Sequence, residues 1–235
     1  MDQGKCALCK VATKICREPG GQGPAFCSTK LYTEAIAKAA AEYDKPDIHE
    51  FARQASIQEA SCYIDREAEP AYLFPVKPRI QELIEFSRKM GYRRLGLAFC
   101  AGLHQEAATV TRILEDHGFE VVSVICKVGG VGKEAIDIKP EEKVRIGSFE
   151  PMCNPVAQAE VLNAAGTDFN ILLGLCVGHD SLFIKYSQAM VSVFAVKDRV
   201  LGHNPLAAVY NYESYYQRFK QDRIKEVAVR EGKGE

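Results

Sequence analysis

The fold is decided by three apolar stretches that each end in cysteine: RLGLAFC (94–100), FEVVSVIC (119–126) and DFNILLGLC (168–176). Each is short and almost continuously apolar, which is typical of a strand that is buried on both faces of a sheet. A fourth strand is predicted at VSVFAV (191–196). The segments before, between and after these strands have the apolar periodicity of helices, which are predicted over residues 79–90, 106–117, 155–165, 181–188 and 205–219. The alternation predicts an α/β fold with a four-stranded, mostly parallel sheet covered by helices on both faces.

The residues before this region have a different character. Residues 1–26 contain three cysteines and the run PGGQGP (19–24), whose glycines and prolines oppose regular structure. Two helices are then predicted, one over 29–43 and one from Pro46 to about residue 62. We therefore expect two domains: a Cys-rich metal-binding loop with two helices over 1–75, and the α/β domain over 76–235.

Composition narrows the class of protein. The 235 residues include 30 basic and 31 acidic side chains, so bulk charge does not favour a nucleic-acid-binding protein. No apolar run approaches the length of a membrane span, and the start MDQGKC lacks the apolar core of an export signal. Nine cysteines, an odd number at low density, favour reduced thiols. We expect a cytoplasmic protein whose partner is a redox protein or a small molecule, with no nucleic acid and no membrane.

Four cysteines are expected at one edge of the predicted sheet. Cys100, Cys126 and Cys176 end three strands, and parallel strands end at a shared carboxyl edge, where open α/β folds bind ligands. Neighbouring strands are about 4.8 Å apart, so their thiolates can reach one metal, whereas a fourth strand in line is about 14 Å away. The fourth ligand is therefore expected from a loop, at Cys153, just before the predicted helix start Asn154-Pro155. The alternative is that each cysteine is simply buried in the core.

A second group of cysteines lies near the N-terminus, at Cys6, Cys9, Cys16 and Cys27. A Cys-x2-Cys pair can direct both sulfurs at one ion, and both zinc and iron–sulfur clusters accept four thiolates. The spacing matches neither the bacterial ferredoxin run nor the usual zinc finger. The alternative is an unstructured terminus with a chance pair. Cys62 lies on a predicted helix face with core residues, so it either packs in the core or completes a site.

Two histidines are further candidates for metal ligation or proton transfer. His179 follows Cys176 in a glycine-containing turn, and it either serves the site or bonds the turn backbone. His203 precedes Asn204-Pro205, so helix capping explains that motif without any chemistry. Lys197, Asp198 and Arg199 could hold an anionic ligand, although a solvated charged loop explains them as well.

Several motifs together resemble an uncharacterised family, the domain of unknown function numbered eighteen-forty-seven. They are Cys6-x2-Cys9, EASC (59–62), MCNP (152–155), GLCVGHDSLF (174–183) and KDRVLGHNP (197–205). The similarity extends from about Cys6 to Tyr216, and the segment GLCVGHD (174–180) is its most specific part. Members of this family are commonly labelled metal-binding proteins, so the resemblance implies a prokaryotic, cytoplasmic, metal-binding protein. It implies no reaction or substrate.

The favoured hypothesis is an iron–sulfur protein with one or two clusters and with redox or small-substrate chemistry at the sheet edge. One centre would use Cys6, Cys9, Cys16 and Cys27, and the other Cys100, Cys126, Cys153 and Cys176, with Cys62 or His179 as substitutes. Two alternatives remain at this point. One is a zinc-stapled non-redox enzyme or sensor, and the other is a small-ligand binding module without chemistry of its own.

Overall fold

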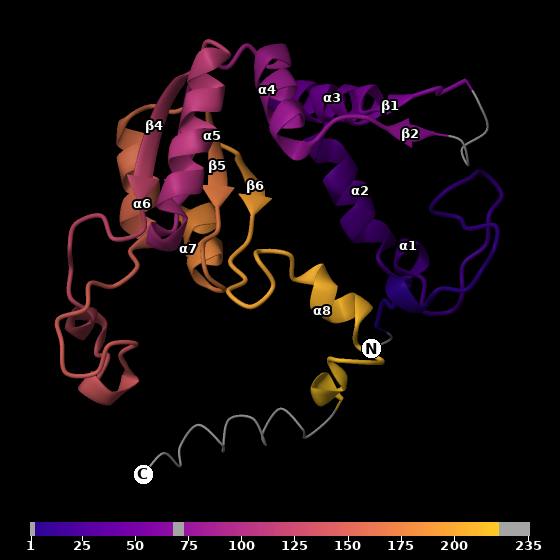
Figure 1. Ribbon diagram of the computed structural model, residues 1–235. Coiled ribbons are helices and arrows are strands. Elements are labelled where there is room, and N and C mark those ends of the chain that lie inside the picture. The colour runs from indigo at the N-terminus through magenta and orange to yellow at the C-terminus, as the bar shows by residue number, and fades with distance from the viewer. Residues whose placement is uncertain (1–2, 68–72, 221–235) are drawn as a thin grey trace. The chain divides into compact units, whose positions relative to one another are not determined.

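A computed structural model describes residues 3–67 and 73–220 of the chain (Figure 1). The chain divides into two compact units, Met1–Lys77 and Pro78–Glu235, which are described separately below. Within the described ranges, every helix is too short or too polar to cross a membrane.

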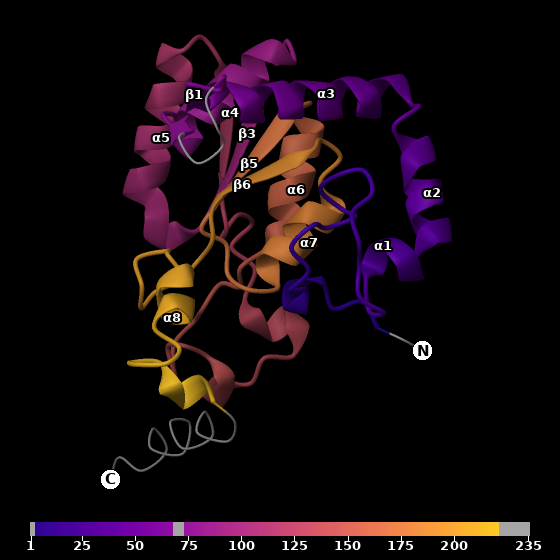
Figure 2. The same cartoon turned by 90° about the vertical axis from the view of Figure 1, so that its right-hand side faces the viewer.

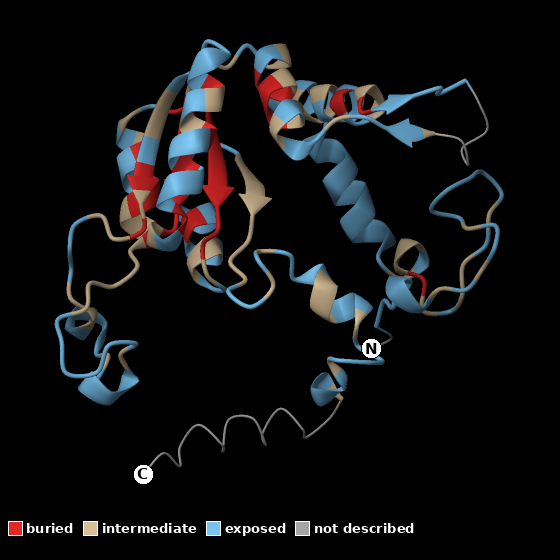
Figure 3. Ribbon diagram, viewed as in Figure 1, coloured by how far each residue is buried: buried red, intermediate tan, exposed pale blue. Residues whose placement is uncertain are grey.

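The C-terminal unit is built around a four-stranded sheet. Its strands are β3 (Arg94–Phe99), β4 (Glu120–Ile125), β5 (Phe169–Leu173) and β6 (Val191–Ala195). Their order is β4-β3-β5-β6 and all three pairings are parallel, which confirms the predicted fold class. The two central strands are the most deeply buried, as the uninterrupted apolar runs predict (Figure 3).

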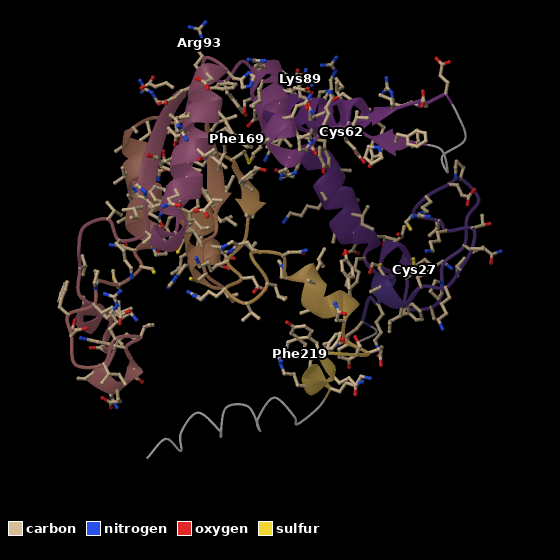
Figure 4. The ribbon with its side chains drawn as sticks, in the orientation of Figure 1. Cys27, Cys62, Lys89, Arg93, Phe169 and Phe219 are labelled. Atoms are coloured by element: carbon tan, nitrogen blue, oxygen red, sulfur yellow. The ribbon has the colours of Figure 1, made fainter. Side chains whose placement is uncertain are left out.

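Helices cover both faces of this sheet (Figure 2). One face carries α4 (Arg79–Lys89) and α5 (His104–Asp116), and the other carries α6 (Pro155–Ala164) and α7 (His179–Tyr186). The Phe86 ring of α4 packs against the Phe169 ring of β5, with centroids 5.6 Å apart. All strands run the same way, so their carboxyl ends form one edge. Arg93 and Phe169, labelled in Figure 4, mark the opposite, amino end of β3 and β5.

A glycine allows β3 and β5 to pack around a buried amide. A Cβ atom on Gly96 would lie 2.0 Å from the Asn170 side-chain oxygen, so no larger residue fits this position of β3. Asn170 is completely buried, and it accepts a hydrogen bond from Thr167 and donates one to Ser187. These bonds satisfy a polar group that would otherwise be costly to bury, and they fasten β5 to the chain on both sides.

The predicted helix over 205–219 is wrong in length. The structure has a short helix α8 (Leu206–Tyr210), then turns, then a 3-10 helix at Gln217–Phe219. The Asn211 side chain donates to the Ala207 carbonyl at 2.8 Å where α8 ends. No residue of α8 is buried, and short helices need such burial to extend in water.

The N-terminal unit contains α1 (Ser28–Leu31), α2 (Thr33–Glu42) and α3 (Pro46–Ser61). The single helix predicted over 29–43 is therefore divided, because Tyr32 leaves the helical region with φ −120° and ψ 39°. A further pair of strands was not predicted: β1 (Tyr63–Ile64) pairs antiparallel with β2 (Phe74–Pro75). Strands of two residues are too short to show the alternation by which sequence reveals a strand.

Candidate functional site

Two cysteines lie directly at the carboxyl edge of the sheet. Cys100 follows β3, and its N–H donates to the Leu173 carbonyl at 3.1 Å. Cys126 follows β4, and its N–H donates to the Phe99 carbonyl at 2.8 Å. The ladder between parallel strands thus continues into both cysteines and fixes their backbones side by side. By contrast, β5 ends at Leu173, so Cys176 lies in the loop beyond it rather than at the end of the strand.

Three sulfur atoms meet at this edge. The Cys153 Sγ lies 3.9 Å from the Cys126 Sγ, and the Cys126 thiol is also hydrogen-bonded to that of Cys100. The Ala101 N–H donates to the Cys126 Sγ at 3.2 Å. The loop that carries Cys153 is held in place by the Asn154 N–H, which donates to the Cys126 carbonyl at 2.8 Å. The three residues come from three separate segments of the chain, and we call them the thiol cluster.

Cys126 is the central member of the thiol cluster. The hydrogen bond with Cys126 lowers the pKa of Cys100 to about 5, and the same interaction on the other side lowers the pKa of Cys153 to about 5. Cys126 is only 2% exposed, and its pKa is raised by its hydrogen bonds with Cys100 and Cys153 and by its burial. The contacts within the cluster therefore favour loss of a proton from the outer thiols, Cys100 and Cys153, and retention of the proton on Cys126.

Cationic side chains surround these sulfurs. Lys197 favours the thiolate of Cys100 and Lys127 favours that of Cys153, in each case by charge and by a hydrogen bond. Arg199 donates from Nη2 to the Cys176 Sγ at 3.1 Å. The pKa of Arg199 is raised by that bond and by the charge of Cys176, with smaller contributions from the charges of Cys100 and Cys153. Arg199 thus connects Cys176 to the thiol cluster.

The two candidate histidines have different surroundings. His179 is the first residue of α7; its Nδ1 is buried and has no hydrogen-bond partner in the described part of the chain. A positive charge on His179 favours the Cys153 thiolate, which places the imidazole near the thiol cluster. His203 instead accepts a hydrogen bond at Nδ1 from the Asp198 N–H at 3.1 Å. That bond closes the turn that carries Arg199, so this nitrogen of His203 serves the backbone.

Gln158 of α6 holds the strand ends next to the thiol cluster by hydrogen bonds. It is fully buried, and its amide donates to the Phe99 carbonyl at 3.2 Å and to the Val124 carbonyl at 2.7 Å. Phe99 ends β3 directly before Cys100, and Val124 lies near the end of β4, two residues before Cys126. The α6 start is fixed by Asn154, whose side-chain oxygen accepts from the Ala157 N–H at 3.0 Å, as the sequence predicts.

Replacing Gln158 by leucine should destabilise the protein. Both carbonyls lose a buried partner, so we expect the free energy of unfolding to fall by about 1–3 kcal/mol. Denaturation in urea, followed by circular dichroism, measures this change. The matched control is Gln81→Leu on α4, where the side chain donates to the neighbouring Glu85 on an exposed surface, and there a change within about 0.5 kcal/mol is expected. Equal losses in the two variants would contradict the role assigned to Gln158.

The N-terminal cysteines lie in the other unit. Cys6 begins a 3-10 turn, and the Cys9 N–H donates to the Cys6 carbonyl at 3.1 Å, so the Cys-x2-Cys segment is a tight turn. The Lys5 N–H donates to the Phe26 carbonyl, which brings this turn beside buried Cys27 at the start of α1. The pKa of Cys6 is lowered by hydrogen bonds from the side chain and backbone of Ser28. Cys16 lies exposed in the intervening loop.

Cys62 also belongs to the N-terminal unit. It is 8% exposed, and its thiol donates to the Gln58 carbonyl at 3.1 Å, one turn earlier in the chain around α3. This is the environment of a cysteine packed at a helix end.

The donor set at the sheet edge fits a soft metal in its chemistry. All nine cysteines are free thiols, and thiolates are the ligands that zinc and iron–sulfur clusters prefer. His179 adds a buried nitrogen that lacks a partner among the described residues. Over residues 3–67 and 73–220, however, no group of three or more His, Cys, Asp or Glu side chains is arranged so that it could hold a metal ion.

Sequence reasoning missed two supporting residues. Lys127 directly follows Cys126 and lowers the pKa of Cys153 by its charge and a hydrogen bond, and its position next to a strand-end cysteine is the signal that could have indicated it. Gln158 is a polar residue on the buried face of α6, and this break in an apolar face is the signal that could have indicated it.

Comparison with known proteins places the chain among uncharacterised relatives. A family model described as "Protein of unknown function (DUF1847)" matches residues 27–194. An uncharacterised protein of Methanocaldococcus jannaschii is 46% identical over 193 residues, which cover 81% of this chain and 93% of the relative.

Proposed function

The chain belongs to the DUF1847 family, as its motifs predict, and from this premise we propose that it binds a metal centre at the carboxyl edge of its sheet. The ligands would be Cys100, Cys126, Cys153 and Cys176, and an iron–sulfur cluster is the first candidate. The proposal depends on one observation, the approach of the Cys126 and Cys153 sulfurs to 3.9 Å. Two thiolates on one tetrahedral ion with metal–sulfur bonds of about 2.3 Å are separated by about 3.8 Å.

The charges around the thiol cluster support the same proposal. Four thiolates around an iron–sulfur core leave a net negative charge, which is costly where the site is half-buried. Compensating positive charge comes from Lys197 beside Cys100, Lys127 beside Cys153 and Arg199 beside Cys176. Binding would also remove the proton from Cys126, so that metal affinity should rise with pH.

Binding requires side-chain rotation. Cys176 now accepts a hydrogen bond from Arg199, and it would exchange this bond for the metal. His179 could replace Cys176 as the fourth ligand, because its Nδ1 is buried and has no partner within the described residues.

An iron–sulfur cluster at this position would supply electron transfer or, with an open coordination position, binding of a small substrate. Cys176 is partly exposed and Arg199 is exposed, so this side of the site is the accessible one. The partner would be a redox protein or a small molecule. Nine free thiols are consistent with a reducing compartment, and we propose the cytoplasm.

A second, structural centre is proposed for Cys6, Cys9, Cys16 and Cys27, and here zinc is the alternative to iron. The observation that favours a staple is that no residue from 3 to 26 is buried, so this loop has no core of its own. A zinc staple at this position would leave the thiol cluster as the reactive part of the molecule.

The test is metal and sulfide analysis, with visible spectra, on protein purified without oxygen. We expect iron and broad visible absorption; Cys100→Ser should remove the edge centre, and Cys6→Ser with Cys9→Ser should remove only the N-terminal one. Cys62→Ser is the control, because that thiol bonds a helix carbonyl, and it should leave metal content unchanged. If the protein is colourless and holds zinc at the N-terminal cysteines alone, the zinc-stapled alternative replaces the proposed iron–sulfur centre at the sheet edge. Metal-free protein would overturn the proposal.

A further inference from the structure

We infer that Cys126 and Cys153 form a disulfide on oxidation by hydrogen peroxide, and that this disulfide and the metal centre exclude each other. The disulfide itself requires only the geometry of the thiol cluster. Its regulatory meaning rests on the proposed function, because both sulfurs are proposed metal ligands.

The geometry already brings the two residues together. Their sulfurs are 3.9 Å apart, although 26 residues separate them along the chain. The Asn154 N–H donates to the Cys126 carbonyl at 2.8 Å, so the two backbones run side by side. A disulfide needs Cα atoms within about 4.4–6.8 Å and sulfurs at about 2.05 Å. Adjacent hydrogen-bonded backbones meet the first condition, and rotation of the two side chains can meet the second.

Exposure assigns different roles to the two thiols. Cys153 is partly exposed, whereas Cys126 is 2% exposed and Cys100 is 9% exposed. Peroxide therefore reaches Cys153 first. Cys126 lies behind it, in contact with the oxidised sulfur, and is the thiol that resolves the intermediate.

The chemistry balances in two steps. The Cys153 thiolate attacks peroxide, forming an S–O bond and breaking the O–O bond, and the departing hydroxide takes up a proton to become water. The Cys126 sulfur then attacks the Cys153 sulfenic acid, forming the S–S bond and breaking the S–O bond, and a second water leaves with the thiol proton. Two thiols lose two electrons in total, and one peroxide accepts them.

Cys153 is a better partner for Cys126 than Cys100 is. Cys100 opens a tight 3-10 turn, Ala101–Leu103, which is packed through buried Leu103. Cys153 ends the long loop that follows Cys126, most of which is exposed. The partly exposed side chain of Cys153 can therefore rotate toward Cys126, while the Asn154–Cys126 backbone bond keeps the two residues side by side.

The experiment uses the full chain, reduced and freed of metal with a chelator. It is treated with one equivalent of peroxide, blocked by alkylation and cut after glutamate. This cleavage, which does not occur at Glu150 because Pro151 follows it, separates the relevant thiols into peptides 86–106 (Cys100), 121–134 (Cys126) and 143–160 (Cys153). We expect peptides 121–134 and 143–160 to be recovered as one cross-linked species that dithiothreitol separates. Reduced Cys126 beside Cys153 sulfinic acid, or Cys126 linked to peptide 86–106, would overturn the inference.

Variants and metal-loaded protein complete the test. Cys126→Ser should abolish the cross-link and leave Cys153 as sulfenic or sulfinic acid; Cys153→Ser should leave Cys126 reduced. Cys62→Ser should keep the cross-link. In protein reconstituted with iron and sulfide, peroxide should form the cross-link at least tenfold more slowly than in metal-free protein. A cross-link without any metal binding rejects the proposed centre only, whereas metal binding without a cross-link rejects this inference only.

Discussion

Gly174→Ala is expected to lower the free energy of unfolding by about 2–5 kcal/mol. Gly174 has φ +68°, a backbone conformation that costs a residue with a side chain about 1–2 kcal/mol. A Cβ atom there would also lie 2.0 Å from the Leu103 Cδ1, and Leu103 is only 4% exposed, so it cannot move aside freely. The shifts that are needed to remove this overlap lower the free energy of unfolding by a further 1–3 kcal/mol, roughly. Urea denaturation of reduced, metal-free protein, followed by circular dichroism, measures the loss.

The matched control for this prediction is Gly166→Ala. Gly166 has φ +63°, but nothing lies within 4 Å of a Cβ atom built on it. Replacing it by alanine should lower the free energy of unfolding by about 1–2 kcal/mol, which is the cost of the positive φ alone. Because Gly174 also carries the chain from β5 into the loop of Cys176, its variant should lose edge metal in addition to stability. Equal destabilisation by the two variants would show that the Leu103 contact does not hold this turn.

In metal-free protein, the alkylation rate of Cys153 should stay near its plateau down to about pH 6. The hydrogen bond from Cys126, aided by the charges of Lys127 and His179, lowers the pKa of Cys153 to about 5. A lowered pKa keeps the thiolate at more acidic pH, so about 90% of Cys153 is ionised at pH 6, against about 0.3% for an ordinary cysteine. The rate at pH 6, relative to the plateau, should thus exceed that of an ordinary cysteine by about 300-fold. Iodoacetamide labelling of Cys153, read from peptide 143–160 after labelling across pH 4–9, measures it.

Variants separate the causes of this shift. Cys126→Ala removes the donor and should move the profile of Cys153 toward higher pH, whereas Cys126→Ser keeps a donor and should move it less. Lys127→Met should raise the apparent pKa by a smaller amount, because charge is a secondary cause. Lys185→Met is the control, since its amino group lies over the Tyr186 ring. A profile centred near pH 8.5 in the unaltered protein would show that Cys126 does not lower the pKa of Cys153.

Much of the α/β fold follows from local sequence. The stretches 94–100, 119–126 and 168–176 are apolar on both faces of a strand, and the helices between them show a clear period, so class and strand direction could be predicted. The positions of Cys100 and Cys126 at one edge follow from the same pattern. Helix ends were less predictable: α8 is shorter than its sequence suggests because its residues find no core to pack against.

The amino-acid sequence by itself determined that buried parallel strands end in cysteine. Only the tertiary structure decided that Cys153 contacts Cys126, that Arg199 bonds Cys176, and that Lys127 and Gln158 support the site. The physical reason is the distance along the chain between the residues that interact. Strand and helix patterns are set by neighbours a few residues apart, whereas these contacts depend on the path of loops such as 127–152, which have no period and are fixed by hydrogen bonds to distant segments.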